Sequence, residues 1–163
     1  MATQQLTLET RRATLADASV VSRLTLQLGY DCSEVMMRQR LARVRDEPEH
    51  AVFVAAIDGL EVVGWVHVEL RKPLWCDPFS EIMGLVVSAH HRRLGVGRAL
   101  VDRVRQWGDE RKVRDLRARA QEHREDALSF YEALGFELYK EQQVYRYPDE
   151  APIDPGGSPT LIE

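Results

Sequence analysis

Apolar and polar positions along the chain repeat with two different periods, which predicts a domain built from both strands and helices. Residues 6–12 alternate apolar and polar side chains, as a half-buried strand does. From Leu15 to Thr25 the apolar positions recur at helical spacing, and Gly29 then ends that helix. The elements predicted for the first half of the chain are a strand at 6–12, helices at 14–29 and 33–45, and a hairpin whose strands 51–57 and 61–70 flank the Asp58-Gly59 turn.

The second half continues the same alternation of element types. Residues 81–87 are almost all apolar, which indicates a strand buried on both faces. The predicted elements are this strand, a helix at 96–111, a strand at 113–120, a helix at 125–134 that stops at Gly135, and a hairpin at 136–147. The order predicts one mixed α/β domain over residues 1–147. Residues 148–163, with four prolines and two adjacent glycines, are predicted to form an extended or disordered tail.

Composition narrows the class of protein. The 163 residues are 44% hydrophobic and 29% charged, an ordinary globular balance. No run approaches the roughly 18 apolar residues of a membrane span, and the first residues lack the apolar stretch of a secretory signal. We therefore expect a cytoplasmic protein without a membrane partner.

The charge distribution argues against nucleic-acid binding. The net charge is −4, and the segment from Asp149 onward holds four acidic residues and no Lys or Arg. The rest of the chain is therefore formally neutral, whereas a nucleic-acid binder needs a net basic face.

Cysteine and histidine spacing gives no sign of a metal site. Cys32 and Cys76 lie far apart and form no C-x-x-C pair. The adjacent His90 and His91 are neighbours in a loop, and such neighbours rarely converge on one metal ion. We expect no bound metal, and the redox state of the two thiols is left open.

The strongest chemical signal follows strand 81–87, where the segment Arg92-Arg93-Leu94-Gly95-Val96-Gly97 runs into a helix. The first turn of a helix has unsatisfied N–H groups and the positive end of the helix dipole. Gly95 and Gly97 remove side chains where an oxygen-rich group would meet the backbone, and the arginines add positive charge. This combination predicts an anion site suited to a pyrophosphate.

The spacing is neither G-x-G-x-x-G nor a P-loop. It resembles the R/Q-x-x-G-x-G/A signature of the GCN5-related N-acetyltransferase (GNAT) superfamily. Three further features carry the same resemblance: the strand before the signature ends at the family's distance, the helix continues from Gly97 as GRALVDRV, and FYEALGFE lies at 130–137. Upstream, LGYDCSE and the hairpin ending in VVGWVHV are also similar to bacterial family members. The resemblance covers roughly residues 8–147, and HREDA-x-x-FYEALGFE is similar to aminoglycoside 6′-N-acetyltransferase-like members.

The resemblance implies an α/β fold, a single GNAT-type domain whose mixed, mostly antiparallel central sheet has about seven strands and helices on both faces. It also implies acetyl-CoA as co-substrate. The pyrophosphate would be held by Arg92, Arg93, Leu94, Gly95, Val96, Gly97, Arg98 and Ala99, and the pantetheine arm would pair with Leu85, Val86 and Val87. Many members carry Asn where this chain has Arg124, which is either a cofactor contact of different geometry or a helix-start charge.

The same resemblance suggests the catalytic residues. Tyr131 matches the tyrosine that protonates the departing thiolate, a transfer that suits a phenol of pKa about 10. Glu81 matches the placement of a general-base glutamate that removes a proton from the acceptor ammonium. Asp77 is a second, weaker candidate for this base.

The resulting hypothesis is an N-acetyltransferase acting on a primary amine of a small molecule by direct attack in a ternary complex. Acceptor contacts are predicted from Tyr30, Trp75, Asp77 and Glu81, which offer charge and aromatic surface to a cation. Alternatives are a protein or peptide N-acetyltransferase and a non-catalytic acyl-CoA sensor. A homodimer is also possible, because family members often pair.

Overall fold

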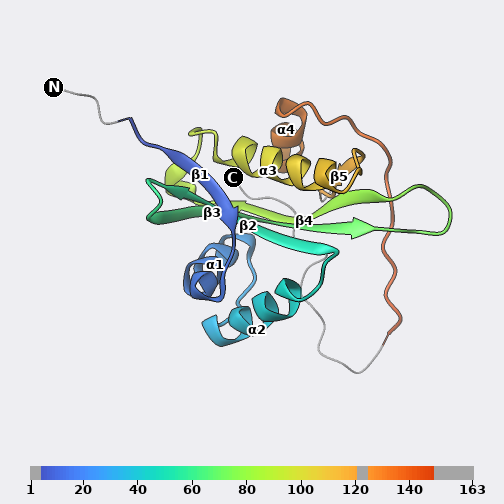
Figure 1. The fold of residues 1–163 in the computed structure, drawn as a ribbon. Coiled ribbons are helices and arrows are strands. Elements are labelled where there is room, and N and C mark those ends of the chain that lie inside the picture. The colour runs from blue at the N-terminus through green and yellow to red at the C-terminus, as the bar shows by residue number, and fades with distance from the viewer. Residues whose placement is uncertain (1–4, 121–124, 149–163) are drawn as a thin grey trace.

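A central β-sheet organises the computed structural model, which describes residues 5–120 and 125–148 (Figure 1). Within these residues the sheet has five strands in the order β1-β2-β3-β4-β5. The strands are β1 (Leu8–Arg12), β2 (His50–Ile57), β3 (Glu61–Arg71), β4 (Phe79–Val87) and β5 (Leu116–Ala118). The first four pair antiparallel, and β4 and β5 pair parallel. The predicted mixed, mostly antiparallel sheet is therefore confirmed.

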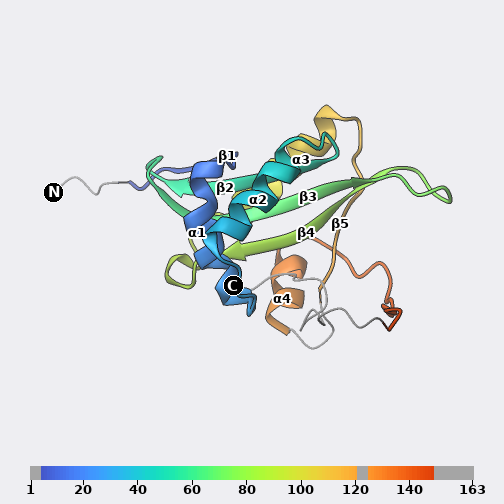
Figure 2. The ribbon, with the colours of Figure 1, turned by 90° about the horizontal axis from the view of Figure 1, so that it is seen from below.

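Helices cover both faces of the sheet, as predicted (Figures 1 and 2). They are α1 (Ala18–Thr25), α2 (Glu34–Arg45), α3 (Val96–Glu110) and α4 (Glu125–Ala133). On one face α1 and α2 pack against Val54, Trp65 and Val86. On the other face α3 and α4 pack against a larger apolar cluster that includes Phe53 and Leu85. The strands that read as continuous apolar runs are those buried between these two layers.

Local signals in the sequence set the ends of several elements. The Ser33 side chain accepts a hydrogen bond from the Met36 N–H at 3.2 Å and so caps α2. Gly29 has a φ of 86°, the left-handed conformation that ends the first helical segment. No helix in the described parts of the chain is long and apolar enough to cross a membrane.

Two predictions about the C-terminal half are wrong. The expected strand over 113–120 is only the three-residue β5, and residues 136–148 form no strand, so the sheet has five strands instead of about seven. Residues 137–147 contain no Gly, Pro, Asn or Asp, so they lack the residues that make a hairpin turn. An alternating pattern favours extended backbone, but it supplies no partner strand for it.

Candidate active site

The backbone of β4 is left without a strand neighbour along half of one side. Its parallel pairing with β5 involves only Ser80, Glu81 and Ile82. Among the described residues, nothing continues this pairing along residues 83–87. Leu85, Val86 and Val87 are buried by their side chains. Their backbone groups on the open side can therefore pair with an extended ligand as an added strand would.

The loop after β4 leads into the start of α3, where the backbone conformation suits the binding of an anion. Gly95 is the N-cap residue, with a φ of 78°, and it has no side chain with which to cap the helix. The helix starts with the bond from the Ala99 N–H to the Gly95 carbonyl at 3.0 Å, so the preceding amides of the first turn are available to a ligand. Arg92 and Arg93 are exposed beside them. The residues present therefore fit a pyrophosphate.

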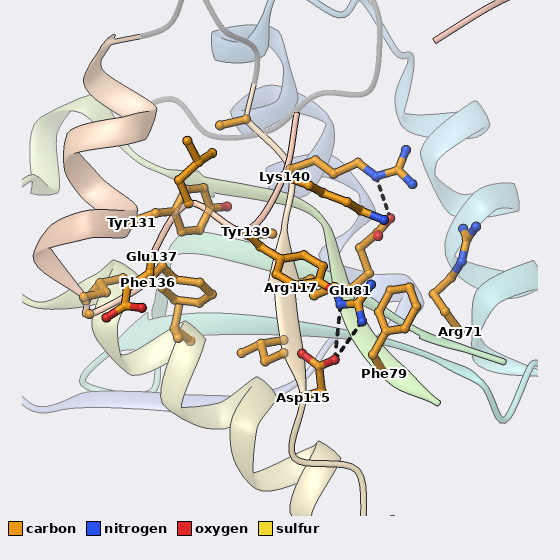
Figure 3. Close-up of a pocket in the computed structure, with 18 of the residues that line it drawn as sticks. Arg71, Phe79, Glu81, Asp115, Arg117, Tyr131, Phe136, Glu137, Tyr139 and Lys140 are labelled. Carbon is orange, nitrogen blue, oxygen red and sulfur yellow. Dashed lines mark hydrogen bonds and ion pairs between the residues drawn. The ribbon is translucent and has the colours of Figure 1, made fainter. Parts of the chain in front are cut away.

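A cavity of about 1300 Å³ is lined by residues of β4, β5, α3, α4 and the chain that follows α4 (Figure 3). Its wall includes Trp75, Glu81, Arg98 and Tyr131 among the residues singled out from the sequence. Arg98 also donates a 3.4 Å hydrogen bond to the Ala133 carbonyl, which ties α3 to α4.

Tyr131 projects from α4 into this cavity (Figure 3). Its ring is 6% exposed and packs edge-on against Phe130 and Phe136, each with centroids 5.2 Å away. Its hydroxyl is buried and has no hydrogen-bond partner among the described residues. Burial raises the pKa of Tyr131 above its ordinary value of 10.0, so the phenol stays protonated. The Tyr131 hydroxyl is thus a buried hydrogen-bond donor without an acceptor among the described residues.

Glu81 is a carboxylate buried to 4% exposure near the beginning of β4. Arg119 Nε lies 2.9 Å from Glu81 Oε1, an ion-pair distance without the alignment of a hydrogen bond. Across the sheet Glu81 faces Glu69 of β3 in register, and Arg117 of β5 on the other side. Arg117 pairs with Asp115 at 2.9 Å and lies 3.7 Å over the Phe79 ring.

A polar row extends from Glu81 across the sheet face that α2 covers. His50 and Glu69 are register partners, so their side chains share this face with that of Glu81. His50 Nδ1 lies 3.0 Å from His67 Nε2, and His50 Nε2 lies 3.2 Å from Glu47 Oε2 and 3.7 Å from Glu69 Oε1. The row places acidic groups beside Glu81 on the side of the sheet opposite α3.

The half-buried His67, which contacts His50 of this row, predicts an acid-sensitive fold. Burial, together with the charge of His50, lowers the pKa of His67 to about 4, below the 6.5 of an unfolded histidine. Between these values the unfolded chain binds more protons than the folded one, so stability falls as pH falls from 6.5 to 4. We expect the free energy of unfolding to drop by about 2 kcal/mol between pH 7 and pH 5. Urea titrations at both pH values measure this.

The control is His67→Gln, which keeps a polar side chain but cannot take the proton. It should remove most of the pH dependence. Equal stability of the unaltered protein at pH 7 and pH 5, or an unchanged slope in the variant, would contradict the prediction.

The structure brings together only part of the site predicted from sequence. Glu81, Trp75, Arg98 and Tyr131 border one cavity, whereas the segments 85–87 and 92–97 lie along β4 and at the start of α3, outside its wall. Tyr30 packs with the α1–α2 cluster, and Asp77 is exposed in the β3–β4 loop, so neither borders the cavity. Arg124 lies outside the described residues.

Several residues of the site gave no signal in the sequence analysis. Arg117 and Arg119 looked like the polar positions of an alternating strand, and their partners follow from the parallel register of β5 on β4. His50 and His67 are 17 residues apart and meet only through the β2–β3 register. Such pairings need the topology of the sheet, which local spacing does not contain.

Comparison with known proteins gives concordant matches. The model of the Acetyltransferase (GNAT) family matches residues 18–136. Aminoglycoside N(6′)-acetyltransferase type 1 of Stenotrophomonas maltophilia is 30% identical over 144 residues, which cover 86% of this chain and 93% of that protein. The fold is similar to aminoglycoside N-acetyltransferase AAC(6′)-Iy in complex with CoA, with a TM-score of 0.79, 19% identity, and coverage of 90% of this chain and 99% of that one. AAC(6′)-Iy bound to the bisubstrate analogue CoA-S-monomethyl-acetylneamine gives a TM-score of 0.77 with 20% identity over 88% and 99% of the two chains.

Proposed function

Because the chain belongs to the acetyltransferase (GNAT) family, we propose that it transfers the acetyl group of acetyl-CoA to a primary amine of a small polycationic molecule, with aminoglycosides as the acceptor class. The observation that carries the proposal is the buried Glu81 carboxylate, placed in an acidic row beside a cavity into which Tyr131 points. Burying a carboxylate in a strand costs desolvation free energy, so a carboxylate at such a position supports a functional role.

The first turn of α3 and the open edge of β4 fit the pyrophosphate and the pantetheine arm of coenzyme A, respectively. The amides and arginines at the start of α3 suit its pyrophosphate. The edge of β4 along residues 83–87, which has no strand partner among the described residues, suits its extended pantetheine arm, and a β4 N–H near Leu85 would polarise the thioester carbonyl. Acetyl-CoA supplies the thioester whose C–S bond breaks during the transfer.

Glu81 and Tyr131 would handle the two protons of the reaction. Glu81 takes a proton from the acceptor ammonium, either directly or through a water molecule, because the nitrogen needs its lone pair to attack the carbonyl carbon. Tyr131 donates its hydroxyl proton toward the sulfur as the C–S bond breaks. The amide product keeps the acetyl group, and a proton returns to Tyr131 from solvent.

The acceptor would lie along the polar row on the α2 side of the sheet. Glu69 and Glu81 face each other in register there, and like charges in such positions repel unless a cation lies between them. Arg71 contacts Glu69 at 3.2 Å and Arg119 contacts Glu81, but both arginines are about 40% exposed and can yield to a ligand. Two neighbouring carboxylates suit a molecule with several ammonium groups.

The test measures release of free coenzyme A thiol with a panel of amines. The decisive pair is two aminoglycosides that differ only in carrying an amine or a hydroxyl at the 6′ position. We expect release only with the amine. Release only with peptides would favour a peptide acetyltransferase, and acetyl-CoA binding without release for any amine would favour a non-catalytic sensor.

A further inference from the structure

The guanidinium of Arg117, in the wall of the cavity of about 1300 Å³, lies against an aromatic ring and a carboxylate (Figure 3). Its central carbon is 3.7 Å from the centroid of the Phe79 ring. Its Nε and Nη2 donate hydrogen bonds to Asp115 Oδ2 at 3.2 and 2.9 Å. The Tyr139 ring lies farther out, with its centroid 4.8 Å away. An aromatic face beside a carboxylate attracts cations, and Arg117 is the cation that occupies this place.

The Phe79 ring face and the Asp115 carboxylate form a cation subsite whose contacts with Arg117 are weak enough to exchange. The Asp115 side chain is 52% exposed, and an ion pair with an exposed partner contributes little to stability. A single contact between a cation and an aromatic ring also contributes modestly. The guanidinium stands at the end of a long side chain on the three-residue strand β5, so it can leave without moving the backbone. Another cation can therefore take its place.

The cation subsite adjoins the buried Glu81 carboxylate. Arg117 and Glu81 are register partners on β5 and β4. Phe79 precedes Glu81 by two residues on β4, so the two side chains lie on the same face of the sheet. The rise of a strand places these two positions about 6–7 Å apart. A molecule with two ammonium groups at this separation can place one beside Glu81 and the other in the cation subsite.

We propose that the cation subsite binds a second ammonium group of the acceptor, which displaces Arg117, on the side of Glu81 opposite to Glu69. The inference rests on the proposed acetyl transfer and narrows its acceptors to amines whose second ammonium lies about 6–7 Å from the first. Arg117 then selects between acceptors. With a monoamine it stays in the subsite, and its charge opposes the approach of an ammonium group to the neighbouring Glu81. A second ammonium group displaces the guanidinium and so removes that charge from the site.

The first test measures binding of 1,4-diaminobutane by calorimetry, without acetyl-CoA. Arg117→Met removes the resident cation and leaves an unbranched apolar side chain. We expect this variant to bind the diamine about tenfold more tightly than the unaltered protein, because no guanidinium has to be displaced. The control Arg114→Met removes another exposed arginine of the same cavity wall, and its affinity should stay within about twofold of the unaltered protein. Equal or weaker binding by Arg117→Met, or an equal gain in Arg114→Met, would overturn the proposal.

The second test removes the carboxylate of the cation subsite. Arg117→Met combined with Asp115→Asn should lose the gain in affinity, since the amide keeps the size of the side chain but not its charge. Combined instead with Asp102→Asn, which neutralises an aspartate of α3 in the same cavity wall, the gain should remain. Asp102 and Asp115 are both exposed, so neither replacement should unfold the protein. If both double variants keep the gain, or both lose it, the effect does not come from the cation subsite and the proposal is wrong.

The last test needs only the unaltered enzyme. It compares acetyl transfer to 1,4-diaminobutane with transfer to butylamine, which has the same carbon chain and a single amine. We expect kcat/KM to be at least about tenfold higher for the diamine. Similar values for the two amines would overturn the cation subsite and leave the proposed acetyl transfer standing. If neither of these amines nor any aminoglycoside is acetylated, the proposed function fails, whereas the calorimetry still decides whether the subsite binds the diamine.

Discussion

Replacing Tyr131 with phenylalanine is expected to lower kcat by roughly two orders of magnitude while leaving the fold at least as stable as before. The change deletes a single hydroxyl group. That group is buried and has no hydrogen-bond partner in the described protein, so its removal breaks no protein contact. A buried polar group without a partner destabilises a fold, and its deletion should leave the free energy of unfolding unchanged or raise it by up to about 1 kcal/mol.

This combination separates a catalytic tyrosine from a core tyrosine. The edge-on contacts with Phe130 and Phe136 survive in phenylalanine, so packing is preserved. Steady-state kinetics with saturating amine gives kcat, and urea titration gives the stability. KM for acetyl-CoA should stay within about twofold, because the lost interaction belongs to the departing sulfur in the transition state.

Tyr139→Phe is the matched control, since Tyr139 borders the same cavity but is 71% exposed. It should keep kcat within about threefold of the unaltered enzyme. If Tyr131→Phe keeps full kcat, the hydroxyl has no part in the chemistry, and its lack of a partner would then need another ligand to explain it.

Those parts of the fold that depend on neighbours in the chain were predictable from sequence. The apolar run at 81–87 indicated a strand buried on both faces, and β4 is one. Gly29 and Ser33 marked helix ends because each acts on backbone groups within four residues. Gly95 likewise marks the start of α3, where the anion site was expected. Local chemistry was enough for these features.

Features that depend on which strand lies beside which were not predictable. The alternation in 136–147 indicated extended backbone, but the expected hairpin is absent because this segment lacks turn residues. Glu81 was predicted from its match to the placement of a family base, yet its environment comes from Arg119 and Glu69, which reach it through pairings on either side of β4. No spacing rule connects residues 69, 81 and 119.

Because Glu81 has this environment, we expect Glu81→Gln to lower kcat strongly, as Tyr131→Phe does. The amide keeps the size of the side chain but cannot accept a proton, and we expect kcat to fall by about 10²- to 10³-fold. The cost in stability should stay below about 1 kcal/mol, because the Arg119 side chain is 42% exposed and can turn to solvent when its partner is neutral. Binding of acetyl-CoA, measured by calorimetry, should not change.

The pH profile of kcat distinguishes a base from a carboxylate that merely holds the acceptor. An acceptor amine with a pKa near 10.4 loses its proton to water as the pH approaches that value, so a missing base matters less there. The deficit of Glu81→Gln should therefore shrink as the pH rises from 7 to 9.5. A raised KM with unchanged kcat at every pH would show instead that Glu81 binds the charge of the acceptor and removes no proton.

Arg119→Met provides the opposite perturbation of the same pair. It leaves the Glu81 carboxylate at 4% exposure without its cation, and an uncompensated buried charge is costly. Because Arg119 itself is partly exposed, the expected loss is about 1–3 kcal/mol of unfolding free energy, larger than that of Glu81→Gln. Removing the cation should thus weaken the fold while removing the carboxylate weakens the reaction. Equal stability losses in the two variants would mean that the Glu81–Arg119 pair serves the structure, and the catalytic explanation of this buried carboxylate would then be wrong.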